Sequence, residues 1–109
     1  MPTFIVTGNY TSKGMKGMVD HPSDRQAATR ALIEAAGGKL TGYYLTSGES
    51  DFMLIIETDD SKNMVPAAMV AGASGSVSGL KTIRAYNNDE FNEMQKAAGA
   101  LAAKFKPAG

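Results

Sequence analysis

The amino-acid sequence predicts an α+β fold: one four-stranded antiparallel sheet with helices on one face and an extra helix at the C-terminal end. Three observations predict this class. Segments with strand-like alternation and segments with helical periodicity follow one another in the order strand, helix, strand, strand, helix, strand, helix. Glycines and prolines separate these segments. The chain has 109 residues, 43% of them hydrophobic, which is enough for one domain, 1–109, with one core.

The first strand and the first helical segment occupy the N-terminal third. Residues 3–10 alternate in polarity, which predicts a strand. One face of this strand carries Phe4, Val6 and Tyr10. Residues 11–36 have helical character, but Pro22 cannot donate a helical hydrogen bond and pushes His21 away from helical angles. The segment is therefore predicted as two pieces that meet near this proline.

The second of these pieces has recognisable ends. Ser23 and Gln26 have the spacing of a capping box, which predicts the helix start. Gly37 and Gly38 supply the left-handed stop. Between them, an apolar stripe at helical spacing is formed by Ala28, Ala31, Leu32 and Ala35.

Two strands, at residues 39–46 and 51–57, are predicted around a polar turn that contains Glu49. The second strand is apolar at five consecutive positions, from Phe52 to Ile56. A strand with one solvated face alternates between apolar and polar residues. This strand is therefore expected to be covered on both faces.

The second half of the chain continues the alternation of helix and strand. Residues 60–74 predict a helix, and Pro66 requires that it either begin near Asn63 or kink. Residues 77–86 predict the fourth strand.

A last helix follows, with Asn87 and Glu90 at capping-box spacing, and residues 106–109 are expected to fray. Its apolar seam consists of Phe91, Met94, Ala98, Leu101 and Phe105.

This element order predicts a ferredoxin-like βαββαβ unit, since two right-handed crossovers flank a hairpin. The expected strand order is 4-1-3-2, with the first and third strands in the centre. Two helices cover only one face of such a sheet, so the other face needs a cover. A second copy packed sheet against sheet is the economical choice, because most soluble oligomers are two-fold dimers. The terminal helix is the alternative cover.

Composition excludes several classes of function. Eleven basic and eleven acidic residues balance and are scattered, which is a poor footprint for nucleic acid or an anionic membrane. No cysteine is present, so disulfides, thiolate nucleophiles and zinc–thiolate sites are excluded. No apolar run approaches the roughly 20 residues of a spanning helix, and no signal peptide is recognised. We expect a cytoplasmic protein without a cofactor, a metal, a nucleic-acid partner or a membrane.

Six stretches of the sequence, taken together, resemble the GYD-domain family of small bacterial proteins, grouped with the dimeric α/β-barrel, ferredoxin-like superfamily. They are "NYT" at 9–11, "DR" at 24–25, "AAGGKL" at 35–40, "YYLTSGESDF" at 43–52, "GASGSVSGLKTIRAY" at 72–86 and "DEF" at 89–91. The resemblance covers nearly the whole chain. It implies a dimeric α/β barrel and implies little about function.

One position departs from the family pattern. The family is named for Gly-Tyr-Asp, whereas the turn here is Gly48-Glu49-Ser50-Asp51. Because Ser50 stands at the tyrosine position, any role of a phenol at that point is absent from this chain.

Asp51 and His21 are the candidate catalytic residues. Glu49 and Asp51 would need environments that separate their pKa values to act as an acid/base pair. Turn formation is the stronger interpretation, because an Asp in a turn accepts local backbone N–H bonds. Asp51 is the better functional candidate because its neighbours are apolar. His21 is the only histidine; it suits proton transfer, although an exposed turn residue is the more common role for such a position.

Tyr10, Tyr43 and Arg84 are the candidate ligand-binding residues. Tyrosines in strands ordinarily pack in half-buried positions. Pairing the hairpin about Glu49 places Tyr44 opposite Leu54, and puts Tyr43 on the other face. On that face it would join Asp51, Met53 and Ile55, which suits either a small ligand or a dimer interface.

Arg84, in the fourth strand, needs a carboxylate if it points inward. A structural ion pair is favoured over a ligand clamp, and Glu57 qualifies as the partner only if the two side chains share a face.

Three functional hypotheses follow. The first is a homo-oligomeric small-molecule-binding domain of GYD type. The second is a cofactor-independent enzyme, monooxygenase-like, on a small aromatic or carbonyl compound, with Asp51 or His21 as base and Tyr43 or Tyr10 as proton donor. Its less favoured form is a tautomerase that uses Pro2 as an N-terminal base. The third is a pure self-association module.

Overall fold

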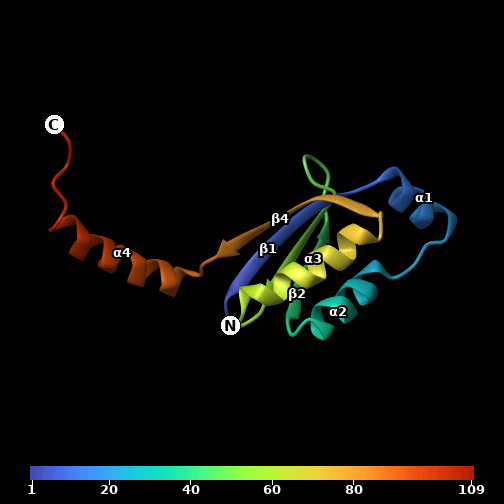
Figure 1. Ribbon diagram of the computed structural model, residues 1–109, viewed down its shortest axis with the longest axis horizontal. Coiled ribbons are helices and arrows are strands. Elements are labelled where there is room, and N and C mark those ends of the chain that lie inside the picture. Colours follow the sequence, from blue (N-terminus) through green and yellow to red (C-terminus); the bar gives the residue numbers. More distant parts are fainter.

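The computed structural model describes all residues, Met1–Gly109, and has the predicted α+β architecture (Figure 1). In chain order the elements are β1 (Thr3–Tyr10), α1 (Ser12–Asp20), α2 (Arg25–Ala35), β2 (Lys39–Leu45), β3 (Phe52–Glu57), a 3-10 turn (Ser61–Asn63), α3 (Met64–Ala73), β4 (Val77–Ala85) and α4 (Asn88–Ala102). The break between α1 and α2 lies at Pro22, as the sequence predicts. α3 begins next to Asn63, which is one of the two outcomes that Pro66 allowed.

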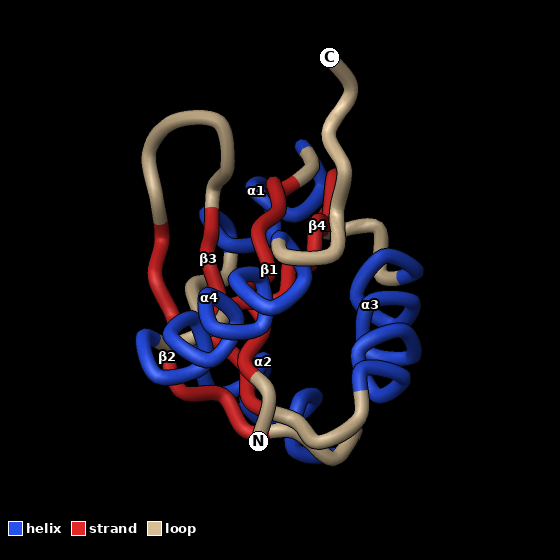
Figure 2. Tube along the Cα trace, turned by 90° about the vertical axis from the view of Figure 1, so that its left-hand side faces the viewer, coloured by secondary structure: helices blue, strands red, loops and turns tan.

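One antiparallel sheet organises the molecule, with strand order β2-β3-β1-β4. This is the predicted ferredoxin-like order read from the opposite edge, with β1 and β3 in the centre. In β1, alternate residues point to opposite sides of the sheet, so Phe4 and Val6 are buried and Ile5 is not. The edge view in Figure 2 shows α3 to one side of the strands.

The core lies between the sheet and two of its helices. The inner face of the sheet is defined here by Phe4, Val6, Phe52, Leu54 and Ile56, which are all buried. Helix α2 contributes Ile33, and α3 contributes Met64 and Ala67. Helix α1 lies beyond the end of the sheet, beside the turn that leads into β4 (Figure 1).

The start of α2 differs from its prediction. The N-cap residue is Asp24, whose carboxylate accepts the Ala27 backbone N–H at 3.0 Å, so the Ser23–Gln26 capping box does not form. An aspartate one residue closer to the helix competes successfully because its oxygen is equally suited to the same orphan N–H groups. The predicted end is confirmed, because Gly37 has a φ of 92°.

The register of the hairpin also differs from its prediction. Tyr43 lies opposite Leu54 and Tyr44 opposite Met53, one residue away from the pairing centred on Glu49. The strands are joined by a six-residue connection, 46–51, closed by a hydrogen bond from the Thr46 N–H to the Asp51 carbonyl at 2.9 Å. Since a one-residue shift exchanges the faces of a strand, Tyr43 belongs to the inner face and Tyr44 to the other.

The opposite, outer face of the sheet is apolar and is not covered by a helix of the same chain. It is defined here by Ile5, Met53, Ile55, Tyr44 and Ile83. Ile83 and Tyr44 are each 57% exposed, and the other three are half-buried. Within one chain, β3 is therefore covered on one face only, and the second cover expected for it does not come from α1, α2 or α3.

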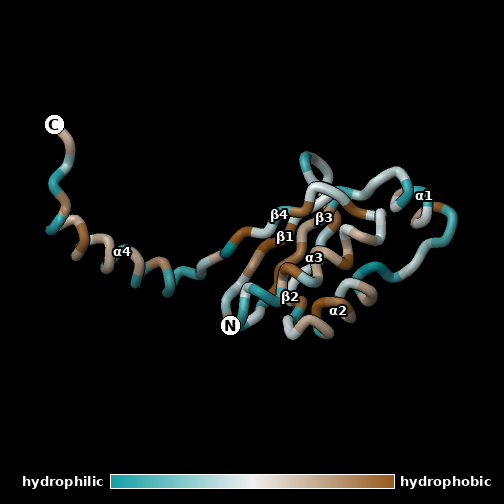
Figure 3. Tube along the Cα trace, viewed as in Figure 1, coloured by the Kyte–Doolittle hydropathy of each residue, from teal (hydrophilic) through white to brown (hydrophobic).

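Helix α4 projects away from the sheet and covers neither face (Figure 1). It contains no buried residue, and Leu101 in its apolar seam is 70% exposed. Apolar and polar segments alternate along it in Figure 3, as in an amphipathic helix without a partner. The Cα radius of gyration is 17.9 Å, against about 13 Å for a compact chain of this length. The terminal helix is therefore not the missing cover.

Candidate functional site

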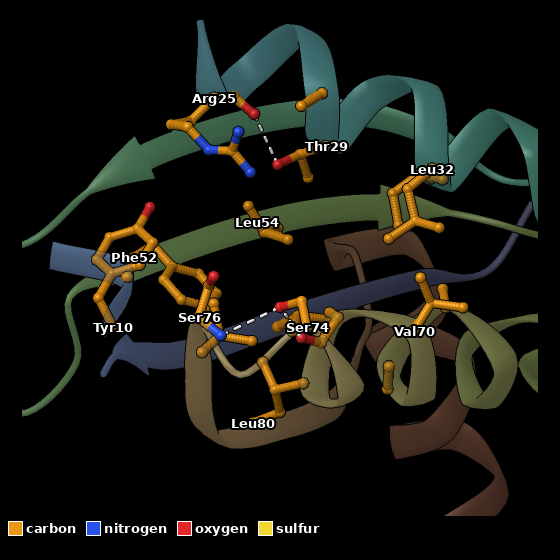
Figure 4. Close-up of a pocket in the computed structure, with 18 of the residues that line it drawn as sticks. Tyr10, Arg25, Thr29, Leu32, Phe52, Leu54, Val70, Ser74, Ser76 and Leu80 are labelled. Atoms are coloured by element: carbon orange, nitrogen blue, oxygen red, sulfur yellow. Dashed lines mark hydrogen bonds between the residues drawn. The ribbon is translucent and has the colours of Figure 1, made fainter. Parts of the chain in front are cut away.

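A cavity of about 560 Å³ lies between the inner face of the sheet and the helices (Figure 4). Its floor includes Phe52, Leu54 and Ile56 of β3, which are also core residues. Leu32 of α2 and Val70 of α3 face each other across it in Figure 4. A cavity of this volume is within the range that holds small organic ligands in proteins.

Small residues on the two helices leave this space open. Ala28 and Thr29 of α2 line the cavity, as do Ala68 and Ala71 of α3. Each pair lies at the position where a larger side chain would fill the space above the sheet. The cavity thus follows directly from an alanine-rich helical layer over a floor of large apolar residues.

Two tyrosine side chains line one part of the cavity. Tyr10 ends β1, and its ring packs against that of Phe52 at a centroid distance of 5.2 Å. Burial raises the pKa of the Tyr43 phenol well above its ordinary value, and the neighbouring Tyr10 phenol raises it further. Arg25 opposes these effects weakly, and Asp24 adds to them. Tyr43 is therefore a neutral hydrogen-bond donor at any physiological pH.

Basic side chains also line the cavity, whereas no aspartate or glutamate is among its 27 lining residues. The guanidinium of Arg25 points into the cavity in Figure 4. Its one side-chain hydrogen-bond partner is the Ser23 hydroxyl, at 3.5 Å. Lys13 donates to the Ser74 carbonyl at 3.2 Å and has no carboxylate partner. His21, the residue that follows α1, also lines the cavity.

Asp51 lies outside the cavity. Its carboxylate accepts the Tyr10 backbone N–H at 2.9 Å, and its own N–H donates to the Gly8 carbonyl at 2.8 Å. These bonds fasten the end of the hairpin connection to β1. Asp51 therefore performs the backbone-bonding role of a turn aspartate, while its predicted catalytic role remains a prediction.

Arg84 also lies outside the cavity. Its guanidinium forms an ion pair with Glu90 at 3.2 Å and stacks over the Tyr86 ring at 4.4 Å. Arg84 pairs with Phe4 and so points to the inner side of the sheet, whereas Glu57 points to the outer side. The proposed Glu57 partner is therefore replaced by Glu90. The sequence predicted Glu90 in the first turn of α4 but did not predict its pairing with Arg84.

The remaining sequence candidates do not line the cavity. Pro2 precedes β1, and its carbonyl accepts the Thr58 N–H at 3.0 Å. Glu49 and Ser50 belong to the hairpin connection and do not line the cavity. No group of three or more His, Asp or Glu side chains is arranged to hold a metal ion. No helix is long and apolar enough to cross a membrane.

Sequence reasoning placed Tyr10, Tyr43 and His21 among the candidates, and the fold brings these three to one cavity. It missed Arg25 and Lys13, because basic residues were weighed only as a scattered set. A usable signal was present in the spacing. Lys16 has an acid four residues later and forms that ion pair at 2.7 Å. Arg25 and Lys13 have Thr29 and Gly17 at the same spacing, so each is left without a local acidic partner.

Comparison with protein families identifies the chain. A model of the GYD domain matches residues 4–95. The chain belongs to the GYD-domain family. The match spans the sheet from its second residue, Phe4, the residues that line the cavity and the first half of α4, and it confirms the resemblance carried by the sequence motifs. No curated protein matches the sequence.

Three solved structures resemble this GYD-domain protein. TTHA0845 from Thermus thermophilus is 16% identical, with a TM-score of 0.51 over 80% of this chain and 95% of that one. FFRP-DM1 is 15% identical, with a TM-score of 0.48 over 79% and 100% of the two chains. The hypothetical protein PHS023 from Pyrococcus horikoshii is 15% identical, with a TM-score of 0.47 over 81% of this chain and 93% of that one. The similarity to TTHA0845 shows a shared fold alone.

Proposed function

We propose that this GYD-domain protein is a homo-oligomeric small-molecule-binding protein, with its ligand held in the cavity between the sheet, α2 and α3. The observation that carries the proposal is the cavity itself, at about 560 Å³ in a chain of 109 residues. Its lining combines a large apolar surface with a few polar groups, which is the usual composition of a ligand pocket. Tyr10, Tyr43 and Arg25 supply the polar groups.

The apolar lining supplies most of the binding free energy. Seventeen of the lining residues are hydrophobic. Removal of apolar surface from water contributes about 25 cal/mol per Å², so even a modest ligand body gains several kcal/mol before entropic costs. The polar groups then orient the ligand.

Filling the cavity tests this proposal. Ala71 lines the cavity on α3, so Ala71→Phe places a ring where the ligand would lie. Compounds that raise the melting temperature of the wild-type protein in a thermal-shift screen are expected to lose that effect in this variant. The matched control is Ala73→Phe, because Ala73 is exposed on the same helix and does not line the cavity. Hits that survive Ala71→Phe would place the site elsewhere.

A cofactor-independent enzyme on a small aromatic or carbonyl compound is the second candidate function. The observation that favours it is that His21, a proton acceptor, lines the same cavity as the phenols of Tyr10 and Tyr43, which are donors. Mass spectrometry of each bound compound after incubation separates the two functions. Conversion that is lost in His21→Gln supports catalysis, whereas compounds recovered unchanged support binding alone.

Self-association is part of the proposal, and the outer face is the surface on which it rests. A second copy is the favoured occupant, because an equivalent apolar face packed against this one gives both copies the cover that neither provides for itself. The exposed seam of α4 adds a second apolar surface to the same chain. The third hypothesis, self-association alone, would be correct if no compound occupied the cavity.

A further inference from the structure

We infer that the ligand of this cavity is a monocarboxylate with a sizeable apolar body, whose carboxylate lies at the mouth beside Arg25 and whose body covers the floor of the cavity. This inference rests on the proposed binding function and specifies its ligand class. It is carried by the distribution of charge around the cavity, by the uncompensated state of its basic residues, and by the apolar floor.

The charges around the cavity have one sign. The two charged side chains that line it, Lys13 and Arg25, are both cationic, and none of the molecule's Asp or Glu carboxylates lines it. The chain as a whole has equal numbers of acidic and basic residues, so this bias is local. Asp24, which precedes Arg25 in the chain, has its carboxylate bonded to the Ala27 N–H at the start of α2.

Arg25 and Lys13 both lack an ionic partner within the protein. The three ion pairs of the molecule are Lys16–Asp20, Arg84–Glu90 and Lys96–Glu93. Arg25 points into the cavity and makes one long side-chain hydrogen bond. A planar guanidinium with most of its donors unused matches the two oxygens of a carboxylate. An anion at this position therefore completes interactions that the protein itself does not make.

The phenols extend this anion site toward the apolar floor. Arg25 is close enough to Tyr43 to affect its ionisation, which places the cation and the phenol in one region. Tyr10 adjoins Tyr43 and packs against Phe52 of the floor, with the two rings tilted by 47°. A carboxylate near Arg25 thus has phenol O–H donors beside it, while a body attached to it runs over Phe52 and Leu54.

A carboxylate fits this site better than a phosphate. Phosphate sites in proteins usually present several backbone N–H groups, often at a helix start. The start of α2 is the helix end next to Arg25, and its N–H at Ala27 is already bonded to Asp24. The carboxylate of Asp24 also repels a doubly charged group more strongly than a singly charged one.

Isothermal titration calorimetry with matched probe pairs tests the inference. The pairs are decanoate with decanol, below micelle concentrations, and 4-biphenylcarboxylate with 4-biphenylmethanol; decyl phosphate is the competing anion. At least one carboxylate is expected to bind more tightly than its alcohol. The difference should be about three- to tenfold at low salt, since Arg25 is exposed and ion pairs there are partly screened, and it should shrink as salt is added.

Variants assign the effect to this site. Arg25→Gln is expected to lower carboxylate affinity to that of the alcohol, and Arg25→Lys to restore part of the difference. Arg30→Gln is the matched control, because Arg30 is an exposed arginine on the same helix that does not line the cavity. Lys13→Gln should lower carboxylate affinity less, since that amine is already bonded to Ser74.

The outcomes separate the ligand class from the binding function. Equal affinity of acid and alcohol, tighter binding of decyl phosphate, an Arg25→Gln variant that keeps the preference, or no binding by any probe would each overturn the inference. If neutral compounds still bind and Ala71→Phe still blocks them, the proposed function stands and the ligand class is wrong. If carboxylates bind equally well to Ala71→Phe, both fail at this cavity.

Discussion

At the scale of single residues, Tyr43 and Tyr44 show how a one-residue shift in strand register determines which side chain lines the cavity. Tyr43 and Tyr44 are adjacent, yet Tyr43 lines the cavity and Tyr44 is exposed on the outer face. The sequence correctly indicated Tyr43 as the tyrosine that would adjoin a site. It placed Tyr43 on the wrong face of the sheet, because the predicted hairpin register was one residue off. The sequence also predicted Asp51 beside Tyr43, whereas Tyr10 and Arg25 are the neighbours of Tyr43 in the structure. Side chains from β1 and α2 reach this point only through the tertiary fold.

The raised pKa of Tyr43 gives a prediction at this scale. An unfolded tyrosine ionises near its ordinary pKa of 10.0, whereas the folded protein holds Tyr43 neutral to higher pH. Below pH 10 both states keep the proton, so Tyr43 adds no pH dependence. Above pH 10 the unfolded state binds fewer protons, so the free energy of unfolding falls as pH rises. Chemical denaturation from pH 9 to 11.5 should show a smaller fall for Tyr43→Phe than for wild type.

The exposed Tyr44 provides the matched control for that experiment. Tyr44→Phe is expected to keep the wild-type fall in stability at high pH. Absorbance titration near 295 nm should also lose its last-ionising phenol in Tyr43→Phe. An unchanged titration in that variant would contradict the buried environment assigned to Tyr43.

At the scale of elements, the position of α1 depends on a single glycine. Gly14 is buried, and a Cβ atom at this position would clash with the backbone carbonyl of Ser76. The Thr11 N–H donates to the same carbonyl at 3.0 Å, which joins the start of α1 to the turn before β4. Because backbone atoms yield less easily than the end of a side chain, any larger residue at Gly14 must displace the helix.

Gly14→Ala is therefore expected to destabilise the protein by about 1–3 kcal/mol, the usual cost of overpacking. Gly17 lies in the same helix and has open space where a Cβ would be. Gly17→Ala should stabilise the protein by about 0.5–1 kcal/mol through helix propensity alone. Urea denaturation measures both changes. Equal effects of the two substitutions would show that α1 does not pack against this turn as described.

The capping residues of α4 determine where this helix begins but not what its apolar seam packs against. Asn87 and Glu90 form the predicted capping box, with hydrogen bonds of 2.8 and 3.1 Å. The backbone bond from Asn87 is the main cause that lowers the pKa of Glu90, and Arg84 lowers it further. These contacts fix where α4 begins. They do not determine which surface its apolar seam will cover.

At the scale of the whole molecule, two apolar surfaces remain without a partner in one chain. The outer face of the sheet presents Ile83 and Tyr44, and the α4 seam presents Phe91 and Leu101, all more than half exposed. Exposed apolar patches larger than a few hundred Å² are uncommon on soluble monomers and mark interaction sites. A homo-oligomer that buries the outer face is the arrangement this distribution favours.

Light scattering coupled to size-exclusion chromatography tests that arrangement. The wild-type protein is expected to be a dimer or larger, and Ile83→Lys to be a monomer, because a charge within an apolar interface is costly to bury. Ile83 is exposed within one chain, so the fold should survive, which circular dichroism checks. Val65→Lys is the matched control on the exposed side of α3 and should leave the oligomer intact. A monomeric wild type would refute the role given to the outer face.

The sequence by itself determined the order of the elements, the strand order, the break at Pro22, the stop at Gly37 and the cap of α4. Most of these features depend on residues close together in the chain, through periodicity, proline geometry and local hydrogen bonds. The strand order follows instead from the order of the elements and the right-handedness of the two crossovers. The family, too, was identifiable from short motifs spread over the chain.

Only the tertiary structure decided the site. The cavity requires alanines of α2 and α3 to face large residues of β3, and its charge depends on Arg25 and Lys13 from separate helices. The hairpin register, which set the face of Tyr43, was fixed by bonds among Thr46, Asp51 and β1 rather than by turn composition. Contacts between residues distant in sequence carry no periodic signal, so the sequence supplied the parts of this site without showing which of them meet.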